Sequence, residues 1–387
     1  MDVDFVSSWT CPTMREVVEK VNAQRAAGAP SAIFALHNEI RPADLVCYLA
    51  ARFGNPNGVM NALRAQHSDN LWHWDWTLET RHGLVAIWGG NFRTQIVLIG
   101  PYPFGAEIKD ALIEAIKADF KQYGPAMAKV RNRLERWTEF VNPYGRLKRA
   151  IEELHGEVRQ LDLDASRFEA LSSPLDIRGQ EKSFHELTIR FQRAFGLCFG
   201  IRAMLPVKAE AFVNLLLFAL MRPDIKADDR LRQNTIRQPI DIRIKSLHIN
   251  CTGFERPIDY ANLACANFHA LINERNDLLH GNVAPEKNAF NELYFLGTVP
   301  IFKQYRSFFE RTIAEDRAAA GLDRVNGELA VVDEFIAYVF SCLKPEIRQL
   351  MTMLVQTRNL GISQDDGHLA VLFSETLVDS EAGGENP

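Results

Sequence analysis

The stretch LWHWDWTLETRHGLVAIWGGNFRTQIVLIG, residues 71–100, contains three runs rich in apolar, aromatic and β-branched side chains. Short turns containing Gly or Asn separate the runs, a pattern typical of strands joined by hairpins. Upstream, the sequence predicts a strand over 31–36 and helices over 12–28 and 42–54, since a proline opens and a glycine closes each helix. We therefore expect residues 1–103 to form a small α/β domain in which helices back an antiparallel sheet.

Three tryptophans alternate with polar residues at the start of this stretch. Trp72, Trp74 and Trp76 are two residues apart, and a period of two places all three indoles on one face of a strand. One interpretation is a platform on which nucleic-acid bases stack. The other is a sheet face packed against helices, which we favour because large aromatic side chains dominate protein cores.

Beyond residue 103 the pattern becomes helical. We expect a helical connector over 104–178, an all-α domain over 179–360 and a flexible acidic tail over 361–387. The fold class is therefore α+β, with a small N-terminal α/β domain and a helical C-terminal domain. The most apolar helices of the second domain are expected at 181–200 and 208–221, with later ones at roughly 299–319 and 328–358.

Composition indicates a soluble protein with two domains, or one large domain with appendages. The chain has 387 residues, of which 47% are hydrophobic and 24% charged. The longest apolar run, 211–221, is too short to span a bilayer, and the first residues lack the pattern of a secretion signal. Six scattered cysteines without a CxxC pair favour reduced thiols and argue against a zinc site. We expect a cytoplasmic protein with no metal, no other cofactor and no membrane partner.

Charge is distributed unevenly along the chain. The net charge is −5, and the six acidic residues after position 359 face no Lys or Arg there, so the rest of the chain carries +1. Residues 129–149 hold seven basic and two acidic side chains, and residues 222–245 hold seven and four. Such stretches either follow a phosphate backbone or are solvated helix faces. The candidates for RNA contact in the second stretch are Arg230, Arg232 and Arg237.

The stretch INERNDLLHGNV, residues 272–283, concentrates the side chains suited to chemistry. It predicts the end of a helix running from about 260 to 280, with Asp259 as the N-cap and Gly281 as a left-handed C-cap. Offsets of three and four residues place four polar side chains in one ladder along that helix: His269, Asn273, Asn276 and His280. Arg275 lies about 100° around the helix from Asn276.

An arginine and a histidine are the minimal set for RNA cleavage without a metal. The imidazole of His280 can move a proton near neutral pH, and the guanidinium of Arg275 can hold a phosphate by two parallel hydrogen bonds. The attacking 2′-hydroxyl belongs to the substrate. Chance alone predicts about one Arg-x4-His spacing in this chain. A second one, Arg243 to His248, lacks the flanking Asn and Gly, and we treat it as coincidental.

The residues Arg275, Asn276 and His280 in RNDLLHGN resemble the signature of the HEPN superfamily. The resemblance covers roughly residues 180–360. It implies a helical bundle that dimerises, bringing two Arg/His sets into one cleft, and metal-independent endoribonuclease activity, frequently in toxin–antitoxin, anti-phage or abortive-infection systems. By this resemblance Arg275 binds and polarises the scissile phosphate, His280 acts as general base or acid, and Asn276 orients one of them.

Two functions from different classes follow from these patterns. The first is an endoribonuclease that works as a homodimer, with the N-terminal domain sensing a trigger or selecting RNA, and with an antitoxin or trigger protein as a further partner. The second is a non-catalytic module that binds RNA or a partner protein. An unrelated enzyme site in the N-terminal domain has no motif in its favour. Three further polar residues are expected to support the Arg/His site: Asn273, Asp277 and His269.

Overall fold

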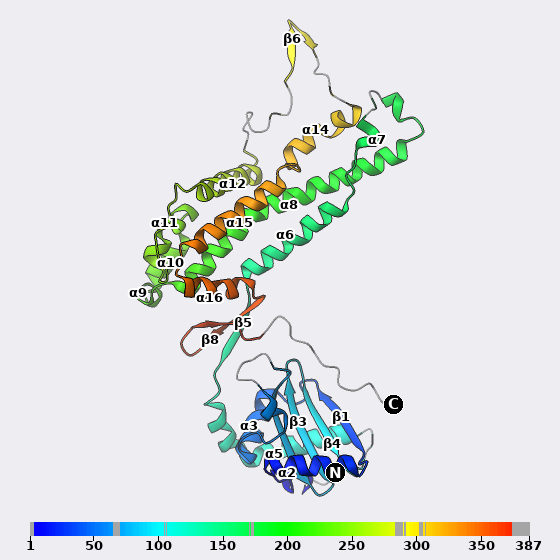
Figure 1. The fold of residues 1–387 in the computed structure, drawn as a ribbon, viewed down its shortest axis with the longest axis vertical. Coiled ribbons are helices and arrows are strands. Elements are labelled where there is room, and N and C mark those ends of the chain that lie inside the picture. The colour runs from blue at the N-terminus through cyan, green and yellow to red at the C-terminus, as the bar shows by residue number, and fades with distance from the viewer. Residues whose placement is uncertain are drawn as a thin grey trace. The chain divides into compact units, whose positions relative to one another are not determined.

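The computed structural model describes residues 4–373, and the positions left out within that range are 65–69, 104, 106, 170, 172–173, 283–288, 290–291, 302–304 and 306. The chain divides into two compact units. Unit 1 consists of Met1–Glu139 and Gly361–Pro387, and unit 2 is Phe140–Leu360. Unit 1 contains an antiparallel sheet and unit 2 is largely helical (Figure 1). The predicted mixed fold class, with its sheet near the N-terminus, is confirmed.

Unit 1 is built on a four-stranded antiparallel sheet in the order β1-β4-β3-β2. Its strands are β1 (Ser31–Leu36), β2 (Trp72–Thr80), β3 (Gly83–Gly90) and β4 (Thr94–Ile99). Its helices are α1 (Asp4–Ser7), α2 (Met14–Ala26), α3 (Pro42–Phe53), α4 (Met60–Leu63) and α5 (Ile108–Arg131). The strands and helices predicted between residues 12 and 100 are all present.

The core of unit 1 extends past the predicted domain end at residue 103. Residues of α5, including Leu112 and Ile116, share one apolar cluster with Trp76 of the sheet and Tyr48 of α3. The Tyr48 hydroxyl also donates a hydrogen bond of 2.6 Å to the buried carboxylate of Asp119 on α5. The connector predicted over 104–178 is therefore wrong, because α5 belongs to the first core.

The predicted placement of three indoles on one sheet face is also wrong. A β-bulge shifts the register of β2 between Trp72 and Trp74, and an extra residue turns the preceding side chain to the other face. Trp74 packs toward Trp76 on the core side, with ring centroids 5.9 Å apart, whereas Trp72 contacts Trp88 at 5.1 Å. Trp76 is 2% exposed. The core interpretation therefore holds for Trp74 and Trp76, and no continuous stacking platform exists.

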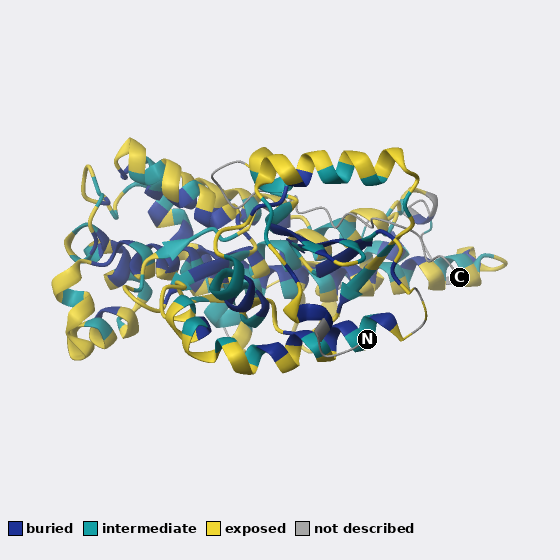
Figure 2. Ribbon diagram, turned by 90° about the horizontal axis from the view of Figure 1, so that it is seen from below, coloured by how far each residue is buried: buried dark blue, intermediate teal, exposed yellow. Residues whose placement is uncertain are grey.

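Unit 2 is organised around one long helix, α8 (Glu181–Leu220), against which α6 (Pro143–Gln160), α12 (Leu263–His280), α14 (Phe308–Ala320) and α15 (Val325–Ser341) pack (Figure 1). Individual helices show buried residues on one side and exposed residues on the other (Figure 2). The remaining elements of unit 2 are η1 (Pro174–Ile177), α7 (Ser166–Glu169), α9 (Pro223–Ala227), α10 (Asp229–Arg237), α11 (Ile240–Asn250), β6 (Tyr294–Leu296), β7 (Val299–Ile301) and α16 (Pro345–Gln356).

The two apolar helices predicted at 181–200 and 208–221 are one helix. α8 continues through Pro206, which has no N–H for the Arg202 carbonyl. Leu205, Pro206 and Ala209 are all buried, so packing offsets the lost hydrogen bond. In the described part of the chain, α8 is the one helix long and apolar enough to cross a membrane. However, 56% of its most apolar window is buried, as in a core helix of a soluble protein.

Other predicted boundaries change for reasons of packing. The region 143–160 is α6, which packs on α8 within unit 2 and is no connector. The helix predicted from 299 begins at Phe308, because residues 294–301 form a hairpin. Of the predicted tail, residues 361–373 are described and include the end of β8 (Asn359–Ser363) and β9 (Leu369–Ala370), next to β5 (Trp137–Val141). The rest of the tail lies outside the described residues.

Candidate active site on helix α12

The ends of α12 fix where the motif side chains lie. The helix begins at Leu263, and the Asn262 side chain accepts a hydrogen bond from the Ala264 N–H. The predicted N-cap, Asp259, is wrong, because its carboxylate accepts from Ala261 in the turn before the helix. At the other end Gly281 has φ of 63°, as predicted for a left-handed cap. His280 therefore occupies the last helical position.

One side of α12 is anchored by apolar packing. Phe268, Leu271 and Ile272 are buried, and the Phe268 ring stacks on Phe335 of α15 with centroids 4.2 Å apart. This apolar packing anchors α12 against α8 and α15.

The predicted polar ladder faces solvent. His269, Asn273 and His280 are exposed and Asn276 is half-buried. The Nδ1 atom of His269 lies 2.9 Å from the Tyr260 hydroxyl, so this histidine has a local surface partner. Asn273 and His280 remain accessible to a ligand.

Asp277 closes the end of the helix. Its backbone carbonyl accepts from the N–H groups of Gly281 and Asn282, and its carboxylate accepts from the Asn282 side chain at 3.0 Å. These contacts fix the cap after His280, so Asp277 has a structural role.

Arg275 points to the opposite side, toward α8. Its Nη2 forms an ion pair of 3.2 Å with Oε1 of Glu210, and its side chain is 18% exposed. Glu210 also lies 3.5 Å from Nη2 of Arg243 on α11, and Arg243 Nη1 donates to Asn214 Oδ1 at 2.5 Å. We call these four residues the Glu210 cluster.

The Glu210 cluster carries excess positive charge. Two guanidinium groups share one carboxylate, and in the described part of the chain the buried Nε atoms of Arg275 and Arg243 have no hydrogen-bond partner. Buried donors are normally satisfied, and leaving one unpaired is costly. An anionic group approaching the exposed part of Arg275 would supply the missing charge.

Within one copy, Arg275 and His280 do not form a joint site. Five residues correspond to a turn of about 140° and a rise of about 7.5 Å. Among the described contacts, no hydrogen bond or ion pair joins the two side chains. The structure places the guanidinium against α8 and the imidazole in solvent.

The arginines of α10 form a separate surface. Arg230 and Arg237 are exposed, and Arg232 pairs with Asp229 of its own helix at 2.6 Å. No described hydrogen bond or ion pair links these arginines to α12. They are available for long-range attraction of an anion.

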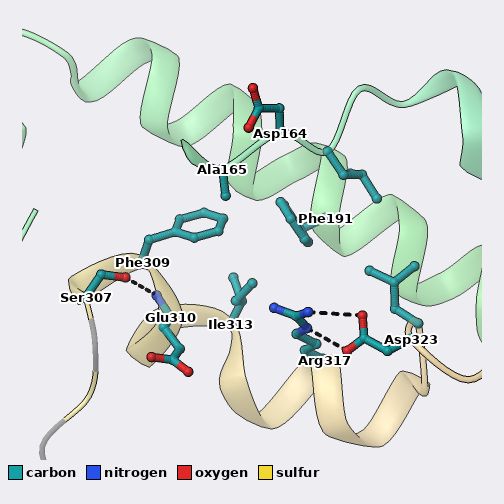
Figure 3. Close-up of a pocket in the computed structure, with 11 residues that line it drawn as sticks. Asp164, Ala165, Phe191, Ser307, Phe309, Glu310, Ile313, Arg317 and Asp323 are labelled. Carbon is teal, nitrogen blue, oxygen red and sulfur yellow. Dashed lines mark hydrogen bonds and ion pairs between the residues drawn. The ribbon is translucent and has the colours of Figure 1, made fainter. Parts of the chain in front are cut away.

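A pocket of about 600 Å³ lies elsewhere in unit 2, between α8 and α14. Phe191 and Phe309 form its apolar wall, and Arg317 is already bound by both oxygens of Asp323 at 2.9 and 3.0 Å (Figure 3). Asp164 also lines it. Its acidic character disfavours a phosphate, and none of the residues singled out in the sequence lines it.

Sequence patterns missed three members of the Glu210 cluster. Glu210 and Asn214 interrupt the apolar run of α8 one turn apart, which was an available signal. Arg243 was set aside with the second Arg-x4-His spacing. His248 from that spacing is half-buried, and its Nδ1 has no partner among the described atoms. Only the packing of α8 with α11 and α12 brings the cluster together.

Comparison of the chain with family models, with curated proteins and with solved structures gave no match. No group of three or more His, Cys, Asp or Glu side chains placed to hold a metal ion occurs among the described residues. No relative thus supplies an activity, a substrate or a partner for this chain.

Proposed function

We propose that this chain is a metal-independent endoribonuclease of the HEPN type that acts as a homodimer. The observation that carries the proposal is the arrangement at the end of α12. Arg275 is oriented by a carboxylate on the longest helix of unit 2, and His280 is exposed at a glycine-capped terminus. The helices packed along α8 are compatible with the bundle that the RNDLLHGN resemblance implies.

In the proposed reaction the substrate supplies the nucleophile. His280 takes the proton from a ribose 2′-hydroxyl, and that oxygen attacks the adjacent phosphorus. The bond from phosphorus to the 5′-oxygen of the next nucleotide breaks, and the imidazolium returns its proton to that oxygen. The products are a 2′,3′-cyclic phosphate and a 5′-hydroxyl. Arg275 stabilises the charge that develops on the phosphoryl oxygens.

The proposed site takes its two groups from different copies. Arg275 and His280 of one chain diverge around α12, so a single phosphate does not reach both without rearrangement. Two helices related by a two-fold axis can place the guanidinium of one copy beside the imidazole of the other. Asn276, half-buried and next to Arg275 in the chain, would orient Arg275 or His280.

The test compares cleavage of a fluorescent RNA by wild type, Arg275→Ala and His280→Ala. We expect each substitution to lower the rate by about 100-fold or more, because general acid–base and charge-stabilising groups contribute that much. Matched controls are His185→Ala, at an exposed position of α8, and Arg15→Ala in unit 1, which should cleave normally. The wild-type rate should be equal in EDTA and in magnesium. Normal cleavage by His280→Ala would overturn the proposal.

The proposed cellular role is a toxin or anti-phage effector, with unit 1 as the sensing part and an antitoxin or trigger protein as regulator. Expression of wild type should arrest growth and fragment RNA, and both active-site variants should abolish this effect.

One observation favours the alternative of a non-catalytic module that binds RNA or a partner protein. Arg275 already has a carboxylate partner, and no described contact joins it to His280. Purified protein that shifts RNA in a gel without cutting it, with a growth effect that survives Arg275→Ala, would establish this alternative.

A further inference from the structure

Residues 294–301 form a hairpin that projects away from the helices of unit 2 (Figure 1). β6 and β7 pair antiparallel across the two residues Gly297 and Thr298. Gly297 has φ of 61°, the left-handed conformation needed at the first position of the tight turns that close such hairpins. The local sequence therefore favours this hairpin, because it places a glycine at the position where the turn requires a positive φ.

One face of this hairpin is exposed and largely apolar, apart from the Tyr294 hydroxyl, which donates to Glu292 at 3.3 Å. The pairs Tyr294–Ile301 and Leu296–Val299 lie on the same side, because side chains alternate along each strand. Their exposed fractions are 66% and 52% in the first pair and 76% and 61% in the second. We call these four residues the hairpin face. An isolated two-stranded hairpin is at best marginally stable in water, so this face needs a cover.

The apolar area of the hairpin face indicates what kind of contact can cover that face. The hairpin face offers roughly 300 Å² of apolar surface. A standard interface buries about 800 Å² per partner. The hairpin face thus supplies roughly a third of one side of such an interface. Hydrogen bonding along three-residue strand edges would contribute much less.

The composition of the segment argues for a second copy as the occupant. The hairpin face has no charged side chain, and residues 292–301 contain Glu292 but no Lys or Arg. An anionic membrane attracts basic segments, so it is disfavoured. A charged peptide would find no complementary charge. An equal apolar face fits best, and a two-fold axis can bring identical faces together.

The strand edges favour a closed pair over a fibre. Pro300 lies opposite Phe295, and this pair is next to the pair Leu296–Val299 that flanks the turn. Pro300 has no N–H to offer to an added strand, and proline on a short edge strand prevents edge-to-edge growth. The hairpin face can therefore be covered without continued addition of chains.

We propose that two copies of this chain pack their hairpin faces against each other and that this contact holds the dimer. Thirteen residues separate His280 from Tyr294, so at most ~48 Å of chain joins the end of α12 to the hairpin. Contact between hairpins therefore tethers the two α12 termini to one another. The inference deepens the proposed ribonuclease, which depends on two copies, but the readouts below need no RNA.

The first test measures the mass of the full chain by sedimentation at micromolar concentration. Wild type should be a dimer, and Leu296→Asp should weaken association by roughly 30-fold or more, because it places a charge in the centre of the contact. Leu63→Asp is the matched control, since Leu63 is 74% exposed and Leu296 is 76% exposed. Circular dichroism should show the same helix content in all three. A monomeric wild type, or an equal loss in Leu63→Asp, overturns the proposal.

A charge-pairing test shows whether the hairpin meets its own counterpart. Leu296→Glu and Leu296→Lys should each be monomeric, and their mixture should recover a heterodimer because opposite charges then face each other. Two folded proteins that remain monomeric when mixed overturn the proposal. Wild-type monomers that float with neutral or anionic vesicles overturn it too, in favour of a membrane surface. A dimer that behaves as expected but cleaves no RNA leaves this inference intact and removes the proposed function.

Discussion

Glu210 contacts both arginines of its cluster, and this predicts how its removal acts on RNA. In Glu210→Gln the guanidinium groups lose their shared counter-charge, so they attract phosphate more strongly but are less firmly oriented. We expect tighter RNA binding together with a turnover rate about 10-fold lower. Binding and single-turnover rates of a fluorescent RNA would separate the two effects. Glu186→Gln, on an exposed turn of the same helix, should change neither. A parallel fall in binding and rate would argue against a positioning role.

Asp75 in unit 1 is a buried carboxylate whose environment predicts a pH effect. It is 2% exposed, it accepts from the Met60 N–H at 3.1 Å, and its Oδ1 has no partner among the described atoms. Burial raises the pKa of Asp75 from 3.8 to about 6, although the hydrogen bonds from Met60 and Thr77 oppose the rise. The folded state therefore binds a proton more readily than the unfolded state.

The raised pKa of Asp75 makes the stability of unit 1 depend on pH, and this dependence can be measured. Since the folded pKa of Asp75 is the higher one, its contribution to the stability of unit 1 is most favourable below pH 4 and is lost as the pH rises to about 6. Asp75→Asn should remove up to about 3 kcal/mol of this pH dependence. All six tryptophans lie within residues 1–139, so tryptophan fluorescence during urea unfolding reports unit 1 alone. Identical pH profiles for the two proteins would refute the prediction.

At the scale of residues, the sequence predicted those features of the site that depend only on residues close by in the chain. The Gly281 cap and the terminal position of His280 follow from a glycine after a periodic run. The pairing of Arg275 with Glu210 could not be predicted, because the two residues are 65 positions apart and meet only when α8 and α12 pack. The direction of the long Arg275 side chain is set by its ion pair with Glu210.

At the scale of elements, α8 is joined to α15 by a buried ion pair. The Nε of Arg202 donates to both carboxylate oxygens of Glu328 at 3.0 and 2.9 Å, and the two side chains are 7% and 10% exposed. Removing one partner leaves the other charge buried and alone. We expect Arg202→Met to lower the free energy of unfolding of unit 2 by about 3–5 kcal/mol. Arg202→Met combined with Glu328→Met should recover most of that loss in chemical unfolding followed by circular dichroism. A double variant less stable than the single one would contradict this account.

Periodicity predicted most elements but not their irregularities. The strands of unit 1 were visible because apolar runs and turn residues recur at short range. The bulge at Trp72 was not, because only pairing with β3 reveals the extra residue. The second strand of the hairpin, β7, fell within a helix predicted from about 299, and β6 was not predicted, because short apolar runs are ambiguous between strand and helix. Two separate apolar runs were expected where α8 is one helix, because burial on both sides of Pro206 maintains the helix across it.

At the scale of the whole molecule, the two-copy site predicts complementation between inactive chains. Arg275→Ala retains His280, and His280→Ala retains Arg275, so a mixed dimer contains one complete pair. Random exchange of subunits should restore roughly a quarter of the wild-type cleavage rate, because half of the dimers are mixed and each has one of two sites. The mixture should be assayed after subunit exchange against each variant alone. A mixture as inactive as its components would show that both groups come from the same copy.

Domain boundaries were the least predictable feature at this scale. Changes in composition suggested breaks near 103, 178 and 360. The chain passes between its units at 139–140 and 360–361, so only the last predicted break coincides with an observed one. α5 and α6 have similar charged, helical sequences, so composition could not tell which core each would join. Apolar faces decide this: α5 packs on α3, and α6 packs on α8.

The discontinuous first unit has a consequence for synthesis on the ribosome. β8 is the sheet neighbour of β5, but it is translated only after the whole of unit 2 has emerged. At ordinary elongation rates that delay is roughly ten to forty seconds. During this time Trp137–Val141 has no partner strand from the described three-stranded sheet, so we expect that sheet to be the last of the described sheets to form.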